Sequence, residues 1–300
     1  MSNSRWHKDN LRRLLISQQE EYQRRELEHT LYTETDEAFY ATWLHHRLII
    51  LSLIPIECRK PGTKVLDVGG GKGRISTLLS NLELKCVNID CLFQDKDALN
   101  VVGKPLIPLL EAYNEEKGVS VVACDVYEDG IPFPDDTFDL VIFSEVIEHL
   151  PNSPKPLLSE MSRVLRNGGW LILTTPNLVS FEKRILTLCG LSTRSPIKSF
   201  YEMEGYPIGT IYRGHNREYT LQEVEYMLSQ ANFTIESRQR IDFSPPKGLG
   251  RLFQKIFSDM FTDNRAYHLR VRRALFKFGE FACKKISSGM SDYIAILARK

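Results

Sequence analysis

Four glycines lie within five positions, residues 69 to 73, of the 300-residue chain, directly after the apolar run KVLDV. Glycine inside a helix or strand costs roughly 0.5–1 kcal/mol relative to alanine, so a cluster indicates a sharp turn or a close approach of the backbone to another group. A helix-like stretch begins near Arg74. A glycine loop that opens a helix presents unpaired backbone N–H groups, so the pattern predicts a ligand site.

Two common nucleotide-binding patterns do not fit this loop. A GxxxxGK[ST] phosphate loop fails, because glycine follows Lys72. The dinucleotide pattern GxGxxG matches Gly69 and Gly71 but has Arg74 in place of the third glycine. The pattern that remains is Asp-x-Gly-x-Gly-x-Gly, which begins at Asp67.

This order resembles motif I of the class I S-adenosylmethionine-dependent methyltransferases, and further motifs follow in that family's order over about residues 62–243. Asp90 ends a strand-like run 23 residues after the first acid, and Asp125 ends the next run. The stretches at 132–150 and 157–177 resemble the family's fourth-strand motif and its fifth strand. The likeness is to small-molecule members, those of ubiquinone-biosynthesis type and bacterial enzymes associated with glycans or lipids.

The resemblance implies S-adenosylmethionine as the cofactor and a role for each matched residue. The glycine loop would approach the methionine end, Asp90 would hold the ribose hydroxyls, and Asp125 the adenine amino group. The residues expected to bind the cofactor are Asp67, Gly69, Gly70, Gly71, Asp90, Asp125, Val126, Ser144 and Glu145. Gly70 is a small departure, since many relatives carry cysteine or another small residue there.

A second set of chemistry-bearing residues, Glu145, Glu148 and His149, follows the fourth strand-like run. His149 resembles the histidine of an EHL-type motif, which implies a base or a substrate-orienting group. The alternative is a helix residue bonded to a neighbouring loop. Glu145 is expected to support cofactor or substrate, and Glu148 to be a solvated or capping carboxylate.

The segment YRGHNREYT, which ends at Thr220, contains a third set. His215, Arg217 and Tyr219 alternate along it, so they are expected to share one face. Arg217 is suited to clamp a carboxylate or phosphate, and similar segments occur in bacterial methyltransferases that resemble glycan- or lipid-modifying enzymes. The alternative is a helix start, with Glu223 completing a capping box. The expected catalytic residues are His149, His215 and Arg217.

Histidine and cysteine spacing predicts no metal site. His45 and His46 are adjacent in a helix-like segment, so they point to different faces, and surface or cap contacts are expected for them. The six cysteines contain no CxxC pair and several lie in apolar runs, which favours buried, reduced thiols.

The elements that must position these residues alternate between strand-like and helix-like runs. Strands are expected at 64–68, 85–90, 119–125, 138–144, 169–176, 233–243 and 291–299. Near-continuous apolar strands alternating with helices predict a parallel sheet covered on both faces. We therefore expect a doubly wound α/β fold with seven mostly parallel strands, the Rossmann-like methyltransferase arrangement.

The expected organisation is an N-terminal helical cap over residues 1–60, with helices at 10–31 and 36–54, followed by a methyltransferase domain over residues 61–300. A helix is also expected over 220–231.

Two insertions, 177–218 and 244–290, are longer than such a fold requires, and long loops usually form lids or partner surfaces. We expect the first to be a substrate lid. Residues 247–285 carry ten Lys or Arg against three Asp or Glu, a local charge of +7, and their apolar residues recur at helical spacing. The alternatives are a helical lid and, over 247–286, a surface for anionic lipid, a lipid-linked phosphate or a partner protein.

The whole chain has a formal net charge of +1, so it carries no global attraction to nucleic acid, and no DNA partner is expected. The polar N-terminus and the longest apolar run, 48–56, which is short of the roughly 20 residues of a membrane span, favour a cytoplasmic protein. The lipid-surface alternative for 247–286 would add peripheral contact at the inner membrane face.

The sequence thus favours an S-adenosylmethionine-dependent methyltransferase that methylates oxygen on a sugar, a lipid-linked molecule or a polyketide-like acceptor. After the fourth strand-like run the chain has SEVIEH, where enzymes that methylate the amino groups of nucleobases have the motif Asn/Asp-Pro-Pro-aromatic. This difference argues against methylation of nucleobase amino groups. The alternatives are an RNA or protein methyltransferase and a non-catalytic cofactor-binding adapter.

Overall fold

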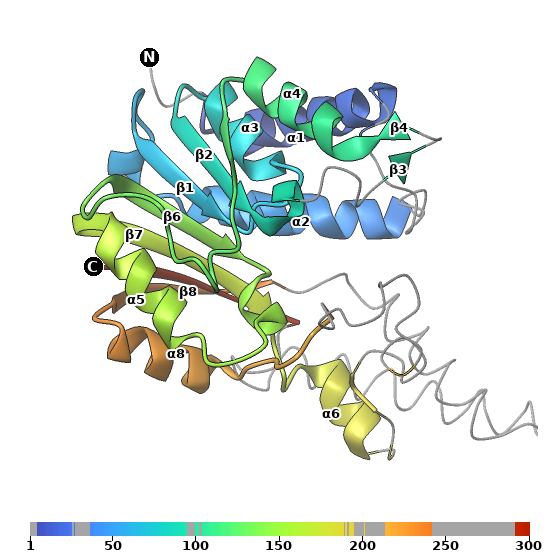
Figure 1. Cartoon of the computed structure of the whole chain (residues 1–300). Coiled ribbons are helices and arrows are strands. Elements are labelled where there is room, and N and C mark those ends of the chain that lie inside the picture. Colours follow the sequence, from blue (N-terminus) through green and yellow to red (C-terminus); the bar gives the residue numbers. More distant parts are fainter. Residues whose placement is uncertain are drawn as a thin grey trace, which may run out of the picture.

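A seven-stranded sheet with helices on both faces forms the centre of the computed structural model (Figure 1). The structure describes residues 5–25, 27, 37–94, 100–101, 104–188, 190, 192–194, 201, 214–241 and 292–300. The sheet strands are β1 (Lys64–Val68), β2 (Lys85–Asp90), β5 (Ser120–Ala123), β6 (Phe138–Ser144), β7 (Leu165–Pro176), β8 (Thr234–Ile241) and β9 (Tyr293–Arg299), and a small ribbon pairs β3 (Asn100–Val101) with β4 (Lys104–Pro105). The described helices are α1 (Lys8–Arg24), α2 (Glu37–Leu53), α3 (Arg74–Asn81), α4 (Leu106–Glu116), α5 (Lys155–Val164), α6 (Phe181–Leu188) and α8 (Leu221–Gln230), with 3₁₀ turns η1 (Ile56–Cys58), η2 (Cys91–Gln94) and η3 (Ile147–His149).

The strand order is β5-β2-β1-β6-β7-β9-β8, and β9 runs in the direction opposite to the other six strands. The predicted doubly wound, mostly parallel sheet is therefore confirmed. The chain moves outward from β1 to β2 and β5, then returns to lay β6 on the other side of β1. This reversal opens a crevice at the carboxyl ends of β1 and β6, where open α/β sheets bind ligands.

Three expected strands coincide with β1, β2 and β6, and the others differ by a few residues at their ends. The largest difference is in β7, which begins at Leu165 rather than at residue 169. Gly168 and Gly169 lie in a bulge inside this strand, because the pairing with β6 continues on both sides of them.

Both faces of the sheet are buried, which explains the continuous apolar runs. Leu140 and Ile142 of β6 lie in a cluster with α1, α2 and α3, whereas Val141 and Phe143 lie in the opposite cluster with α5 and α8. Alternate residues of a strand point to opposite faces, so a strand covered on both sides is apolar throughout.

The N-terminal helices α1 and α2 pack against the sheet within the same cluster as α3. α1 also holds the start of α3: Tyr22 Oη donates to the Lys72 carbonyl at 3.0 Å, and Gln18 Nε2 donates to the Arg74 carbonyl at 2.9 Å. In the described part of the chain, no helix combines the length and the apolar character needed to span a membrane.

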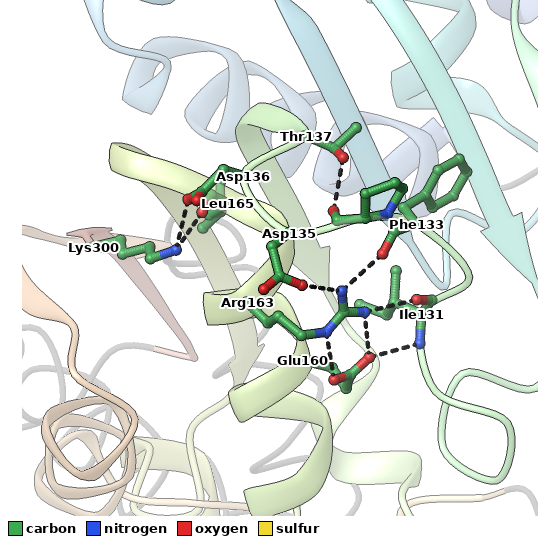
Figure 2. A network of polar contacts seen from close by, with 10 residues as sticks. Ile131, Phe133, Asp135, Asp136, Thr137, Glu160, Arg163, Leu165 and Lys300 are labelled. Atoms are coloured by element: carbon green, nitrogen blue, oxygen red, sulfur yellow. Dashed lines mark hydrogen bonds and ion pairs between the residues drawn. The ribbon is translucent and has the colours of Figure 1, made fainter.

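On the opposite face, Arg163 of α5 ties this helix to the segment between β5 and β6 (Figure 2). Its guanidinium donates to both carboxylate oxygens of Glu160, to Asp135, and to the carbonyls of Ile131 and Phe133, at 2.7–2.9 Å. The side-chain amino group of Lys300, just after β9, donates a hydrogen bond to the Asp136 carboxylate in the same way. These contacts fix the segment that leads into β6, whose far end carries the candidate site.

The first insertion leaves and re-enters the fold at one point, because Asn177 and Tyr219 form a bridge between their backbones. α6 lies within it. The second insertion, 244–290, lies outside the described residues, and so do the amphipathic helix and the membrane contact predicted for 247–286. The thiols of Cys58, Cys86 and Cys124 are buried and form no disulfide, as expected.

Candidate active site

The glycine loop joins β1 to α3 at the crevice. Gly69 N donates to the Ile89 carbonyl at 2.8 Å, which fixes the loop against β2. Gly70 needs its small size, because a Cβ there would lie 2.5 Å from Asn88 Oδ1 and 2.6 Å from Asp67 Oδ2. The loop is therefore packed from below by polar side chains and can present its other side to a ligand.

Asp67, the first acid of the motif, is buried beneath this loop and accepts a hydrogen bond from Ser76 Oγ at 2.6 Å. Burial raises the pKa of Asp67 to about 6, although the Ser76 hydrogen bond opposes the shift. The folded chain therefore retains a proton on Asp67 at pH values where an exposed aspartate would have lost it.

Asp90 and Asp125 end neighbouring strands of the sheet. Asp90 accepts hydrogen bonds from Gly71 N at 2.8 Å and from Leu92 N at 2.7 Å, so its carboxylate is fixed against the glycine loop. Asp125 accepts from Tyr127 N at 3.1 Å in the turn after β5, and Val126 packs against the core there. Both acids thus stand at the carboxyl edge of the sheet.

A cavity of about 180 Å³ lies between the glycine loop, the end of β6 and α2. Five of the predicted cofactor residues line it: Asp67, Gly69, Gly70, Ser144 and Glu145. The other four, Gly71, Asp90, Asp125 and Val126, are outside its lining. The lining residues that the sequence did not indicate are Trp43, His46, Arg47, Ile50, Lys72, Arg74 and Ile75.

Four of these additional residues come from α2. Its pattern of apolar residues predicts burial but gives no sign of which helix face turns to a ligand.

His46 corrects an expectation from the sequence. We expected a surface or cap contact, but its side chain is 2% exposed, and its Nε2 lies 3.3 Å from both Glu145 Oε1 and Thr174 Oγ1. Thr174 Oγ1 donates to Glu145 at 2.8 Å and lies 2.7 Å from Ser144 Oγ. His45 and His46 lie on different faces of α2 as predicted, but the face that carries His46 lines the cavity.

Burial lowers the pKa of His46 to about 3 and raises that of Glu145. Burial thus disfavours the charged form of both side chains where they approach to 3.3 Å. Glu145 also has a backbone φ of 58°, the left-handed region that non-glycine residues seldom adopt. Such strain persists where the surroundings impose it, often at functional sites, and here Glu145 N donates to the Thr174 carbonyl at 3.0 Å.

This burial makes stability sensitive to acid. Because the folded pKa of His46 lies below the unfolded value of 6.5, the unfolded chain binds more protons between those values, and stability falls as the pH falls. We expect this residue to contribute a loss of about 2 kcal/mol in unfolding free energy between pH 6.5 and pH 5. Denaturant titrations should show a smaller acid loss in His46→Gln than in the wild type.

His45→Gln is the matched control, because it removes the adjacent histidine, whose side chain is exposed. Comparing variants at each pH cancels the contribution of other titrating groups, Asp67 among them. Equal acid slopes in all three proteins would contradict the prediction.

Glu148 also differs from its expectation as a solvated or capping carboxylate, because it is fully buried. Thr175 Oγ1 donates to its Oε2 at 3.0 Å, while Oε1 accepts no hydrogen bond from the described residues. Burial raises the pKa of Glu148, as it does for Glu145.

His149 and His215 come together as ring neighbours, with centroids 4.9 Å apart in an edge-on arrangement. His215 Nδ1 lies 3.0 Å from Glu218 Oε1, and Glu218 is paired with Lys183 of α6. The backbone N–H group of Asn216 donates to the Glu148 carbonyl at 2.7 Å, which joins the two segments.

Arg217 is separate from these histidines. Its guanidinium lies over the Tyr219 ring at 5.4 Å and pairs with Glu223 at 2.9 Å, and its side chain is 66% exposed. The single face predicted for the segment is therefore only partly observed, because His215 turns toward His149. Thr220 and Glu223 form the capping box of α8 that the alternative predicted.

A family model described as a methyltransferase domain matches residues 32–238, more than half of the chain. The chain belongs to the methyltransferase domain family. The resemblance that the sequence motifs indicated is thereby confirmed, and the match begins within the N-terminal region that contains α2.

Curated relatives of this methyltransferase share the central part of the chain. An uncharacterized methyltransferase of Mycobacterium tuberculosis is 32% identical over 113 residues, which are 38% of this chain and 39% of that protein. A protein of Mycolicibacterium smegmatis, named a probable S-adenosylmethionine-dependent methyltransferase, is 24% identical over 65% of this chain and 60% of its own length. The first match thus spans about two fifths of the relative.

Solved structures agree in fold. A Galdieria sulphuraria protein, described as a candidate sarcosine dimethylglycine methyltransferase, superposes with a TM-score of 0.52 at 17% identity, over 90% of this chain and 91% of its own. The [4+2]-cyclase SpnF superposes with a TM-score of 0.51 at 16% identity, over 86% and 80% of the two chains. These likenesses concern the fold alone.

Proposed function

We propose that this methyltransferase transfers a methyl group from S-adenosylmethionine to an oxygen of a small molecule, such as a sugar, a lipid-linked molecule or a polyketide-like acceptor. The observation that carries the proposal is the shared cavity: the glycine loop forms one wall, and Ser144, Glu145 and His46 form another.

The residues present fit the cofactor. At Gly71 a Cβ would meet no atom within 4 Å, so the loop is open on the side away from the core, and the N–H groups at the start of α3 suit a carboxylate. The Asp90 carboxylate is held by two backbone N–H groups and keeps lone pairs for ribose hydroxyls. When bound, S-adenosylmethionine supplies an electrophilic methyl group on a sulfonium.

The protein's own contribution is mainly position. Asp90 and the glycine loop would fix the cofactor, and the groups after β6 would hold the acceptor on the other side of the methyl group, as in-line displacement requires. α2 forms one wall of the cavity through His46 and Ile50. Asn177 and Tyr219, at the two ends of the first insertion, form a backbone bridge just after β7.

A transfer assay tests this function. Purified protein is incubated with methyl-labelled S-adenosylmethionine and an extract of the source cells, and soluble glycan, lipid, nucleic acid and protein are then separated. We expect label in the glycan, lipid or small-molecule fraction and none with an Asp90→Asn blank. Label in RNA or protein would overturn the acceptor class, and cofactor binding without transfer to any fraction would favour an adapter.

A further inference from the structure

Three side chains at the acceptor end of the site form a compact group of metal-ligating types. Glu148, His149 and His215 each offer a ligand atom, and these atoms lie within 4.8 Å of one another. Glu148 Oε1 and His149 Nε2 are 4.0 Å apart. Two ligands at about 2.1 Å from one ion lie at most about 4.2 Å apart, so small rotations of the imidazoles would complete a common site.

Glu148 Oε1 is the second, independent observation. The side chain is fully buried, its other oxygen is held by Thr175, and Oε1 has no hydrogen-bond partner among the described residues. An unsatisfied buried carboxylate oxygen is costly, and buried charges are usually paired or coordinate metals. A cation between this oxygen and the two imidazoles would remove that cost.

The surroundings orient the ligands. The Nδ1 atom of His215 is engaged by Glu218, which leaves its other ring nitrogen, Nε2, as the metal-ligating atom. A carboxylate on the second nitrogen of a ligating histidine is the usual outer partner of a metal site. Lys183 and the backbone bond from Asn216 to Glu148 hold both segments in place.

We propose that Glu148, His149 and His215 bind a divalent first-row transition-metal ion, such as Mn²⁺ or Zn²⁺, that coordinates the acceptor oxygen. Two imidazoles with one carboxylate suit these ions better than Mg²⁺ or Ca²⁺, which prefer oxygen ligands. Three protein ligands leave positions open for a substrate. The catalytic part rests on the proposed function, whereas ion binding can be measured without it.

The ion would activate the acceptor. Coordination lowers the pKa of a bound hydroxyl, so its proton passes to solvent water. The resulting oxygen attacks the methyl carbon, a C–O bond forms, and the S–CH₃ bond breaks with its electron pair on sulfur. The products are a methyl ether and S-adenosylhomocysteine. The acceptor class is then an alcohol or phenol, and a second oxygen beside the first would allow chelation.

Mn²⁺ binding tests the inference directly. Tag-free, chelator-treated protein is titrated with MnCl₂ while free Mn²⁺ is followed by its paramagnetic resonance signal. We expect one ion per chain in the wild type and in His7→Gln, a control at an exposed histidine. Glu148→Gln, which keeps the shape of the side chain, and His215→Ala should each weaken binding at least tenfold.

Cofactor affinity, measured on the same proteins by calorimetry, separates this inference from the proposed function. Mn²⁺ binding lost in both variants, with S-adenosylmethionine affinity retained, would support the site. A wild type that binds neither Mn²⁺ nor Zn²⁺, or variants that bind as tightly as the wild type, would overturn it. If the wild type binds Mn²⁺ but does not bind S-adenosylmethionine, the result would count against the proposed function and not against the metal site.

Discussion

Replacing Gly73 by alanine will destabilise the protein by about 3–5 kcal/mol, because the change combines strain with a collision in the core. Gly73 has a φ of 81° at the N-terminus of α3, and a Cβ there would lie 1.9 Å from Asn114 Oδ1. Asn114 cannot yield cheaply, because it is fully buried and donates to the carbonyls of Lys72 and Leu110. Chemical denaturation at neutral pH measures the loss.

Gly71→Ala is the matched control. Its φ of 54° imposes a similar backbone strain, but no atom lies within 4 Å of the added Cβ. We expect a loss of only about 1–2 kcal/mol, the cost of a left-handed conformation for a residue with a side chain. Equal losses in the two variants would show that backbone strain, and not the contact with Asn114, makes glycine necessary at position 73.

Asp90→Asn will weaken S-adenosylmethionine binding at least 100-fold while leaving the protein folded. The carboxylate accepts from Gly71 N and Leu92 N, and its remaining lone pairs face the ligand edge of the sheet. Charge-assisted hydrogen bonds to two hydroxyls are worth about 1.5–3 kcal/mol each, which corresponds to this loss. Isothermal titration calorimetry measures the dissociation constant, with S-adenosylhomocysteine as a second ligand.

Asp9→Asn is the control for this change, because it alters net charge equally at a carboxylate that is 80% exposed on α1. It should bind the cofactor as the wild type does. A dissociation constant for Asp90→Asn within threefold of the wild type, in a variant that unfolds cooperatively, would remove Asp90 from the cofactor site.

The Gly73 and Asp90 variants test two supports of the same glycine loop. Gly73 holds the turn that aims the N–H groups of α3, and Asp90 ties that turn to the next strand through Gly71. α1 supports the same turn from outside, through Tyr22. α1 therefore stabilises the loop that we propose binds the cofactor.

The amino-acid sequence by itself determined the strands and the glycine loop. The bounds of β1, β2 and β6 coincide with their apolar runs, because a strand buried on both faces shows its extent in local composition. Asp67 lies in the last two residues of β1, Asp90 ends β2 and Asp125 follows the end of β5 by two residues. Parallel strands bring their carboxyl ends to one edge. Local pattern and sheet geometry were sufficient to place them together.

Only the tertiary structure decided which polar side chains are buried beyond the ends of β6 and β7. His46 meets Thr174 across 128 positions of the sequence, and Asn216 meets His149 across 67. Glu148 could not be distinguished from a solvated carboxylate, because its burial comes from a segment far along the chain. Pairings at such separations leave no periodic signal, so the α2 wall and the Glu148, His149 and His215 group emerged only when the chain had folded.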